Sequence, residues 1–548
     1  PGAASAHAVT MAMAVADVSL SGCGIDPVCY ALELAMEAAQ PLIIDGIASI
    51  VTAFDPSAGP IAKLVGSAFF TILDALMFND LGQVPSTVQH LVTDPAMLTW
   101  ISSTVAGNSA LAALPADLRA TIGNAVAYFL QESLGNSTVA DALTPVFSSV
   151  PLPTSFLGLS DWLAHFILSG FDFKQTLQDM IGTPVEKNSL AAFLANAAVQ
   201  QQFGAAFTGA INVLTGATSP PSWATPVSST ALADYLGQLA AGSLPADMSS
   251  AGPVVSTVVS AAVAALLASV GGSVAAQLGT TYTTFMAQPG VNKTLANYVA
   301  NYLLSVVDGQ PLPAPPNTLP AAAQTTFSAL VTSLLSGSVP SAVGTLISSV
   351  VSGLTVSPIV QQLAGQQVTA YVAAMLPGNP IAGPVSTALG GQAVQSLIAN
   401  TTFSGDIASL LGGLVPGLLG QPGVVGALSN AAGTLASAIF SGTDPSTAVA
   451  TALAALRANP VIQNAVQSTT TTTVTALLGD LAMWQVVGSA LATVFTDLVD
   501  QSAVRQYAAQ QVAAYVAQAL AGNPIAGPVS AAIGQAVQTC WGFRRSPG

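Results

Sequence analysis

Apolar side chains between residues 360 and 375 recur at steps of three and four positions. This spacing places them on one face of a helix, whereas a strand would alternate apolar and polar residues. The residues on this face are Val360, Ala364, Val368, Tyr371, Val372 and Met375. We therefore expect an all-α, multi-helix protein with little or no β-sheet. The threonine run at 469 to 473 has high β-propensity, but its helical context predicts a helix there too.

A nine-residue phrase, GNPIAGPVS, follows this helix at residues 378 to 386 and occurs again at 522 to 530. Gly can end a helix, Asn-Pro blocks its continuation, and a later Pro fits the first turn of the next helix. The phrase therefore predicts a corner between two helices. The corner residues are Gly378, Asn379, Pro380 and Pro384, and in the second copy Gly522, Asn523, Pro524 and Pro528. The alternative is that the two loops bind something together.

The phrase belongs to a longer duplication. Residues 360 to 397 align with residues 504 to 540 at an offset of 144, with one deletion at Gly391. Weaker matches begin at Val199, Val291 and Asn459. We interpret these segments as degenerate helix-loop-helix repeats at irregular spacing.

Proline-rich seams suggest domain boundaries, because proline is excluded from helix interiors. The seams lie at 144 to 155, 216 to 229 and 309 to 320. We expect an N-terminal helical region at 1–190, richer in acids and aromatic residues. A helical repeat region at 191–310 and a charge-poor helical region with the duplicated unit at 321–548 follow.

Charged residues make up only 6% of the 548-residue chain, against about a quarter in ordinary soluble domains. Residues 309 to 405 contain none, and the net charge is −15. Nucleic-acid binding needs clustered Lys and Arg, and nine scattered bases cannot provide it. We therefore expect no nucleic-acid partner.

Two apolar runs, at 254 to 270 and 481 to 499, approach the length of a membrane span. The first is short and contains four Ser or Thr residues, and the second includes Gln485 and Asp497. Buried helices of a water-exposed protein are the main alternative to insertion in a lipid layer.

Cys23 and Cys29 flank the turn-forming GIDPV and are candidates for a local disulfide bond. Three reduced thiols are the alternative, and Cys540 has no evident partner. No metal site is expected, because these cysteines lack a second pair at zinc-ligand spacing. The segment AASAHA near the start is similar to the end of a secretory signal. We therefore expect a secreted or cell-envelope protein after removal of a signal peptide.

No catalytic motif emerges. The chain lacks Gly-x-Ser-x-Gly and contains only three histidines, His7, His90 and His165. Asp94 and Asp161 lie one helical turn from His90 and His165, a spacing common by chance. Acid pairs such as Glu33 with Glu37 fit a solvated helix face. We expect no catalytic residues and no cofactor.

Three functions remain open. The first is a non-enzymatic secreted or envelope protein whose charge-poor helices contact lipid or a lipid-rich layer. The second is an assembly protein that forms a homo-oligomeric shell, stalk or filament, since small uncharged faces also suit other subunits. The third is a secreted hydrolase with an unrecognised site. The composition, rich in Ala, Val, Gly, Ser and Thr and poor in Lys, resembles that of exported actinobacterial proteins.

Overall fold

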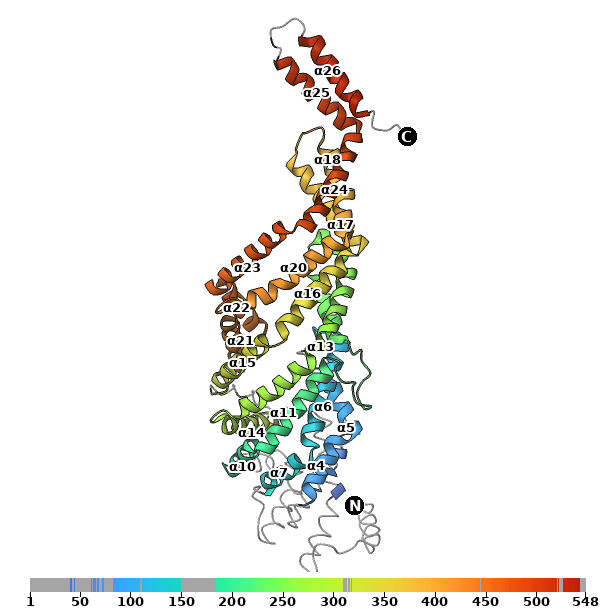
Figure 1. Ribbon diagram of the computed structural model, residues 1–548. Coiled ribbons are helices and arrows are strands. Elements are labelled where there is room, and N and C mark those ends of the chain that lie inside the picture. The colour runs from blue at the N-terminus through green and yellow to red at the C-terminus, as the bar shows by residue number, and fades with distance from the viewer. Residues whose placement is uncertain are drawn as a thin grey trace, which may run out of the picture. The chain divides into compact units, whose positions relative to one another are not determined.

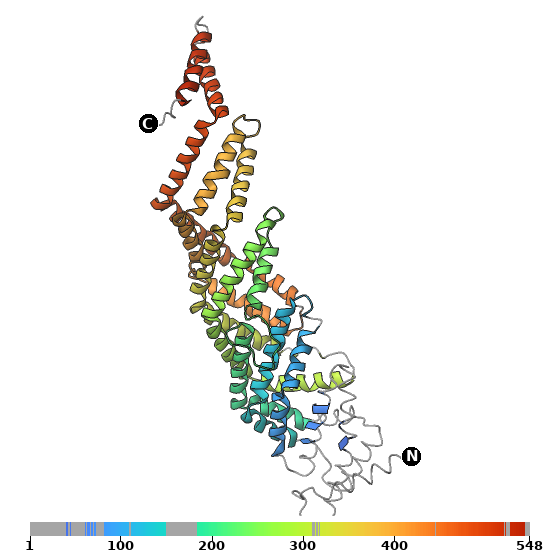
Figure 2. The ribbon, with the colours of Figure 1, turned by 90° about the vertical axis from the view of Figure 1, so that its right-hand side faces the viewer.

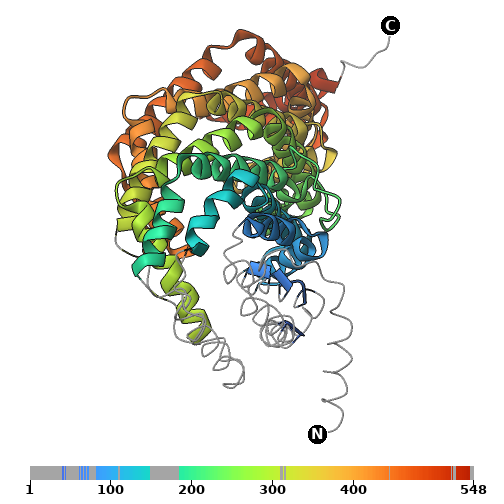
Figure 3. The same ribbon diagram turned by 90° about the horizontal axis from the view of Figure 1, so that it is seen from below.

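The computed structural model describes residues 82–108, 111–148, 184–308, 318–443, 445–519 and 526–542. A few further positions are described between 40 and 72 and at 313, 316 and 521. All regular structure in these ranges is helical, and no arrow appears among the coloured ribbons of Figure 1 and Figure 3. The predicted all-α class is therefore confirmed.

The first helices along the chain are α4 (Gln83–Thr93), α5 (Pro95–Ala106), α6 (Ala116–Leu134), α7 (Ser137–Ser148), α10 (Pro184–Ala195), α11 (Ala197–Leu214), α12 (Ala231–Gly242), the short 3-10 helix η4 (Ala246–Ala251), α13 (Gly252–Met286), α14 (Val291–Asp308), α15 (Thr318–Ser336) and α16 (Val339–Thr355). They are followed by α17 (Pro358–Met375), α18 (Ala382–Thr387), a π-helical turn (Ala388–Ala393), α19 (Val394–Ala399), α20 (Thr401–Leu419), α21 (Val424–Phe440), α22 (Pro445–Ala458), α23 (Pro460–Gly479), α24 (Leu481–Asp500), α25 (Ser502–Ala519) and α26 (Ala526–Gly542). The threonine run lies inside α23, as its context predicts.

The helix predicted over 360 to 375 is α17, but its apolar face is only partly buried. Leu363 and Gly365 are buried, whereas Tyr371 and Met375 are 66% and 65% exposed. The predicted helix is therefore present, and the described structure covers its apolar face only towards the start. Contact with the next helical segment is made at Gly365, towards the start of the helix.

The chain forms two compact units, each built from separate stretches of sequence. Unit 1 comprises residues 1–229, 272–330 and 430–452, and unit 2 comprises residues 230–271, 331–429 and 453–548. The domain boundaries predicted from the proline seams stay a prediction.

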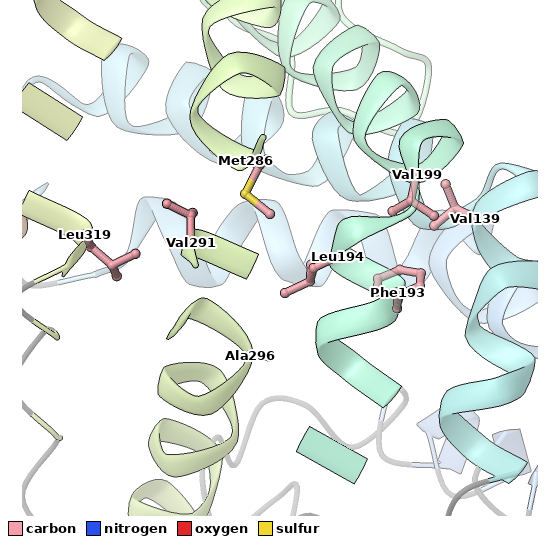
Figure 4. Close-up of a cluster of buried hydrophobic side chains, with 8 residues drawn as sticks. All are labelled: Val139, Phe193, Leu194, Val199, Met286, Val291, Ala296 and Leu319. Atoms are coloured by element: carbon pink, nitrogen blue, oxygen red, sulfur yellow. The ribbon is translucent and has the colours of Figure 1, made fainter. Parts of the chain in front are cut away.

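Unit 1 has a core of large side chains. Its main cluster brings together residues from α7, α10, α11, α13, α14 and α15, shown in Figure 4: Val139, Phe193, Leu194, Val199, Met286, Val291, Ala296 and Leu319. Aromatic rings extend this cluster, with Phe203 meeting Phe193 edge-on at 6.1 Å and Tyr282 stacking on Phe207 at 6.2 Å. Burial raises the pKa of Tyr282 to about 12.

Elsewhere the helices meet through glycine. In unit 2, α16 and α20 cross where Gly344 faces Gly412, and a Cβ on Gly412 would lie 2.7 Å from the Gly344 oxygen. Ser348, one turn after Gly344, donates a hydrogen bond of 2.8 Å to the Ala408 carbonyl, one turn before Gly412. Small residues at such crossings let two backbones approach closely.

The same arrangement recurs in unit 1, between α11 and α13. Gly204 faces Gly279, and a Cβ on Gly279 would lie 2.5 Å from the Gly204 oxygen. Thr208, one turn later, shares its hydroxyl proton between the Gly204 carbonyl of its own helix, at 3.0 Å, and the Ala275 carbonyl of α13, at 3.3 Å. The hydroxyl thus satisfies its own hydrogen-bonding need inside the contact that the glycines create.

Several successive helices join through a single extended residue. Asn196, Asn459 and Asp480 each interrupt the helix for one position and accept hydrogen bonds from the next helix's first amides. A side chain four positions later then donates back across the corner, to a carbonyl of the preceding helix. These donors are Gln200 to Leu194, Gln361 to Thr355, Gln463 to Arg457 and Trp484 to Leu478, at 2.7–2.9 Å. The corners therefore fix the direction of each new helix without a charged residue at the donor position.

Adjacent glycines in α20 provide a test of the crossing. Gly412 is buried against α16, whereas Gly413 is exposed with nothing near its missing Cβ. We expect Gly412→Ala to destabilise the protein by about 1–3 kcal/mol through overpacking. Gly413→Ala should be neutral or stabilising by up to about 1 kcal/mol, because Ala favours helix. Circular dichroism during thermal unfolding measures both, and equal melting temperatures would contradict the crossing.

Tyr282 should lower the free energy of unfolding at high pH. Its pKa of about 12 in the folded state lies above the ordinary value near 10, so the native state holds this proton more tightly. Its contribution is complete below pH ~10 and is lost as the pH rises towards ~12. We expect the free energy of unfolding, measured with urea, to fall less steeply between these pH values in Tyr282→Phe than in the wild type. An unchanged decline would show that other groups cause it.

Candidate functional site: two helical hairpins

Both copies of the duplicated sequence form helical hairpins within unit 2. In the first, α17 packs against α18, the π-helical turn and α19, and in the second, α25 packs against α26. Figure 2 shows the second pair as the red helices that lie side by side. The hairpins are therefore local elements, each built from one continuous stretch of chain.

Equivalent residues make equivalent contacts in the two hairpins. Gly390 approaches Gly365 and Thr369 in the first, and Gly534 approaches Ala509 and Ala513, their counterparts at an offset of 144, in the second. The buried hydroxyls of Ser386 and Ser530 also correspond, donating to the Gly383 and Gly527 carbonyls at 2.9 and 3.0 Å. The wider set of helix-loop-helix repeats stays a prediction.

One difference follows from the extra residue Gly391. It lies in the π-helical turn Ala388–Ala393, whereas α26 continues as an α-helix through the equivalent positions. A π-turn holds one more residue than an α-turn and commonly appears as a single widened turn. The first hairpin therefore absorbs the insertion locally.

The corner of the first hairpin connects Met375 to Ala382. Gly378 adopts a left-handed conformation with φ 73°. Asn379 organises the turn: its amide donates to the Leu376 carbonyl at 3.2 Å, its side-chain oxygen accepts from the Ile381 amide at 3.1 Å, and its carbonyl accepts from the Ala382 amide at 2.9 Å. Pro384 lies in the first turn of α18.

This hydrogen bonding satisfies most of the backbone amides in the corner. The amides of Leu376, Asn379, Ile381 and Ala382 all donate within the corner, and Pro377 and Pro380 have no amide hydrogen. A backbone whose donors are satisfied internally can leave water at lower cost. The Gly378 amide and the carbonyls of Pro377, Gly378 and Pro380 have no backbone partner among the described residues, so the corner meets this condition only in part.

Large apolar side chains stand beside this corner. Tyr371 and Met375, in the last two turns of α17, are 66% and 65% exposed, and Tyr515, the counterpart of Tyr371 in α25, is 73% exposed. No charged residue lies between 309 and 405. Each hairpin therefore presents an exposed, uncharged aromatic residue near its corner.

The remaining predicted residues are less informative. Gly522, Asn523 and Pro524 lie outside the described residues, and Pro528 is an exposed residue of α26. Cys23 and Cys29 also lie outside them, and Cys540 falls at the end of α26. The predicted disulfide bond stays a prediction.

The histidine candidates give no catalytic arrangement in the described ranges. Asp94 is engaged as the cap of α5, where it accepts from the amides of Ala96 and Met97 at 2.8 and 3.2 Å, and His90 is exposed. His7, His165 with Asp161, and the Glu33–Glu37 pair lie outside the described residues. The part of the chain that the structure describes also contains no group of three potential metal ligands.

A second feature of unit 2 is an open groove of about 420 Å³ between α13 and α16. The two helices touch where Gly353 meets Val258, and the groove follows further along both helices. Its lining is uncharged: Ala262, Ala265, Leu266, Ser269, Val270, Ser338, Ser341, Ala342, Thr345, Leu346 and Ser349. Its volume lies in the range of small-molecule pockets, ~300–1,000 Å³.

Three stretches of the described chain are long and apolar enough to cross a membrane by length and composition. They are Ala246–Met286, whose most apolar 18 residues have a mean hydropathy of 2.1, and Thr401–Leu419 and Leu481–Asp500, whose most apolar 18 residues have 1.3. α15 and α16 together would form a fourth, bent by 62°. Two of the three lie within residues 321–548, and the most apolar one lies before them.

The sequence shows that the two tyrosines correspond, but not that they are exposed. The duplication keeps Tyr-Val at 371–372 and at 515–516 inside the segment AYVA, and helical periodicity places Tyr371 on an apolar face without saying what covers it. Comparison with protein-family models, with curated proteins and with solved structures found no match. The functional argument therefore depends on the chain's own chemistry.

Two glycines of the first corner provide a test of its geometry. Gly378→Ala forces an L-residue into a left-handed conformation and should destabilise the hairpin by about 1 kcal/mol. Gly383→Ala is the matched control, because this glycine is exposed, has open space around it and lacks a positive φ. Hydrogen exchange at residues 376 to 387 should accelerate in the first variant only. Equal exchange in the two variants would contradict the described turn.

Proposed function

We propose that this is a non-enzymatic protein of the secreted or cell-envelope compartment, and that unit 2 contacts lipid through its two hairpins. The observation that carries the proposal is the pair of exposed tyrosines, Tyr371 and Tyr515, at equivalent positions beside corners without charged residues. Tyrosine suits the boundary between hydrocarbon and water, because its ring is apolar and its hydroxyl is polar.

The distribution of side-chain size in unit 2 supports this proposal. Helix contacts there are made by small residues, such as Gly344, Gly412 and Ala408. Larger apolar side chains lie outside: among the described residues, eighteen of the twenty-two large hydrophobic side chains that are exposed belong to unit 2. Helices in lipid show the same preference for small residues at their contacts. Contiguous apolar surface on a folded protein commonly marks a binding site.

The charge pattern also favours an apolar partner over an ionic one. A charge carried into hydrocarbon is costly, and neither hairpin has a charged residue between its exposed tyrosine and its corner. With a net charge of −15, the protein would be repelled by an anionic lipid surface. We therefore expect binding to neutral lipid, driven by burial of apolar surface and insensitive to salt.

Flotation with phosphatidylcholine vesicles tests the proposal. The wild-type protein should float with the vesicles equally at low and high salt. The double variant Tyr371→Glu and Tyr515→Glu should lose at least about 10-fold in binding, because burial of each large side chain contributes about 1.5–3 kcal/mol. Both positions are exposed, so circular dichroism should show unchanged folding.

The matched control replaces Gln366 and Gln510 by Glu. These residues occupy equivalent exposed positions on α17 and α25, so the control adds the same charges to the same helices. It should float like the wild type. Wild-type protein that stays at the bottom of the gradient, or equal loss in both double variants, would refute lipid contact through the hairpins.

A further inference from the structure

Helix α24 in unit 2 has three distinct faces. One face is buried, with Met483, Ala490 and Val494 at 8% exposure or less, and Val494 packs against Ala388 and Ala393. The opposite face carries exposed polar residues: Gln485, Ser489, Thr493 and Thr496. Between them runs a third face that is apolar and uncovered.

We define this third face as the α24 stripe. Its large exposed members are Leu481, Trp484, Leu491 and Phe495, which are 79%, 43%, 51% and 67% exposed. Gly488 lies among them and has nothing near its missing Cβ. Positions 481, 484, 488, 491 and 495 alternate steps of three and four residues, the a and d spacing of a coiled-coil seam. The stripe therefore has the pattern of a helix that pairs with another helix.

One anchor of the stripe is held in place before any partner binds. The Trp484 ring nitrogen donates a hydrogen bond of 2.9 Å to the Leu478 carbonyl across the corner at Asp480. A fixed aromatic side chain loses less conformational freedom on association. Trp is also the residue type most often found at the energetic centre of interfaces.

We infer that the occupant of the stripe is α24 of a second copy of this chain. The positions that flank a coiled-coil seam usually select a partner through charge, but here they hold Gln485, Ala492 and Val499 on one side and Val487 and Val494 on the other. No charge in these positions opposes an identical helix. Gly488 allows the two backbones to approach at the middle of the seam.

The available area is consistent with a two-fold dimer. A large aromatic side chain carries roughly 150–250 Å², so the exposed members leave on the order of 400 Å² of apolar surface per copy. Two copies together would bury about 800 Å² of this surface, which is below the ~1,200 Å² of stable interfaces, so we expect a weak dimer. A self-complementary patch of this kind generates a closed pair. The association should therefore be reversible and concentration-dependent.

The polar face argues against a lipid surface as the occupant. Although Leu481–Asp500 is long and apolar enough to cross a membrane, α24 carries exposed Gln485 and Ser489 and ends with Asp497 and Asp500, which are costly to place in hydrocarbon. The stripe also follows the 3.5-residue seam and leaves Gln485 and its neighbours exposed. A second helix covers such a seam without covering the polar face.

Light scattering after size-exclusion chromatography of the full chain, without detergent, tests the inference at several micromolar concentrations. The wild type should approach twice the 54.5 kDa chain mass as concentration rises. The variant Leu491→Glu with Phe495→Glu should raise the dissociation constant at least about 30-fold and run as a monomer. Circular dichroism checks its folding, since both side chains are mostly exposed.

The control is Gln485→Glu with Ser489→Glu, which adds the same two charges on the polar face of α24 and should remain dimeric. A monomeric wild type, or equal dissociation of both variants, overturns the inference. If the wild type is a monomer that binds vesicles, and the stripe variant does not bind them, the stripe contacts lipid instead. Tyr371→Glu with Tyr515→Glu should stay dimeric, so failure of the lipid proposal and failure of this one are separable.

Discussion

The close approach of helix backbones at paired glycines is the contact on which most of this architecture depends. Where Gly344 meets Gly412, or Gly204 meets Gly279, no side chain separates the helices, and a Ser or Thr hydroxyl bridges the two backbones one turn away. Such contacts rely on dispersion and close fit. They need neither ion pairs nor large apolar side chains, which explains how a chain with 6% charged residues can fold.

This mode of packing has a consequence for the surface. When the contacts are made by Gly, Ala, Ser and Thr, the larger apolar residues are left for the outside, as with Tyr371, Tyr515 and Phe495 in unit 2. Unit 1 differs, because Phe193, Phe203 and their neighbours form a core of aromatic rings. The two units therefore differ in what they offer to a partner. Lipid contact and self-association are both uses of the outward-facing residues of unit 2.

Local features of the fold were readable from the sequence, and distant contacts were not. Helices and the corner at Gly378 and Asn379 depend on residues within a few positions of one another, so periodicity and turn chemistry predict them. The pairing of Gly344 with Gly412 joins residues far apart in the chain, and glycine has no side chain to signal a contact. The exposure of Tyr371 could not be predicted for a related reason. Periodicity identifies an apolar face but does not say which turns of it another helix covers.

The widened turn at Gly391 explains how the two hairpins could diverge in length while remaining alike. An extra residue in a regular helix would rotate every later side chain by about 100°, turning a buried face towards water. A single widened turn takes up the added residue, and Ala393, the last residue of that turn, is buried. The duplicated segment therefore gains a residue without interrupting the helical run from Ala382 to Ala399.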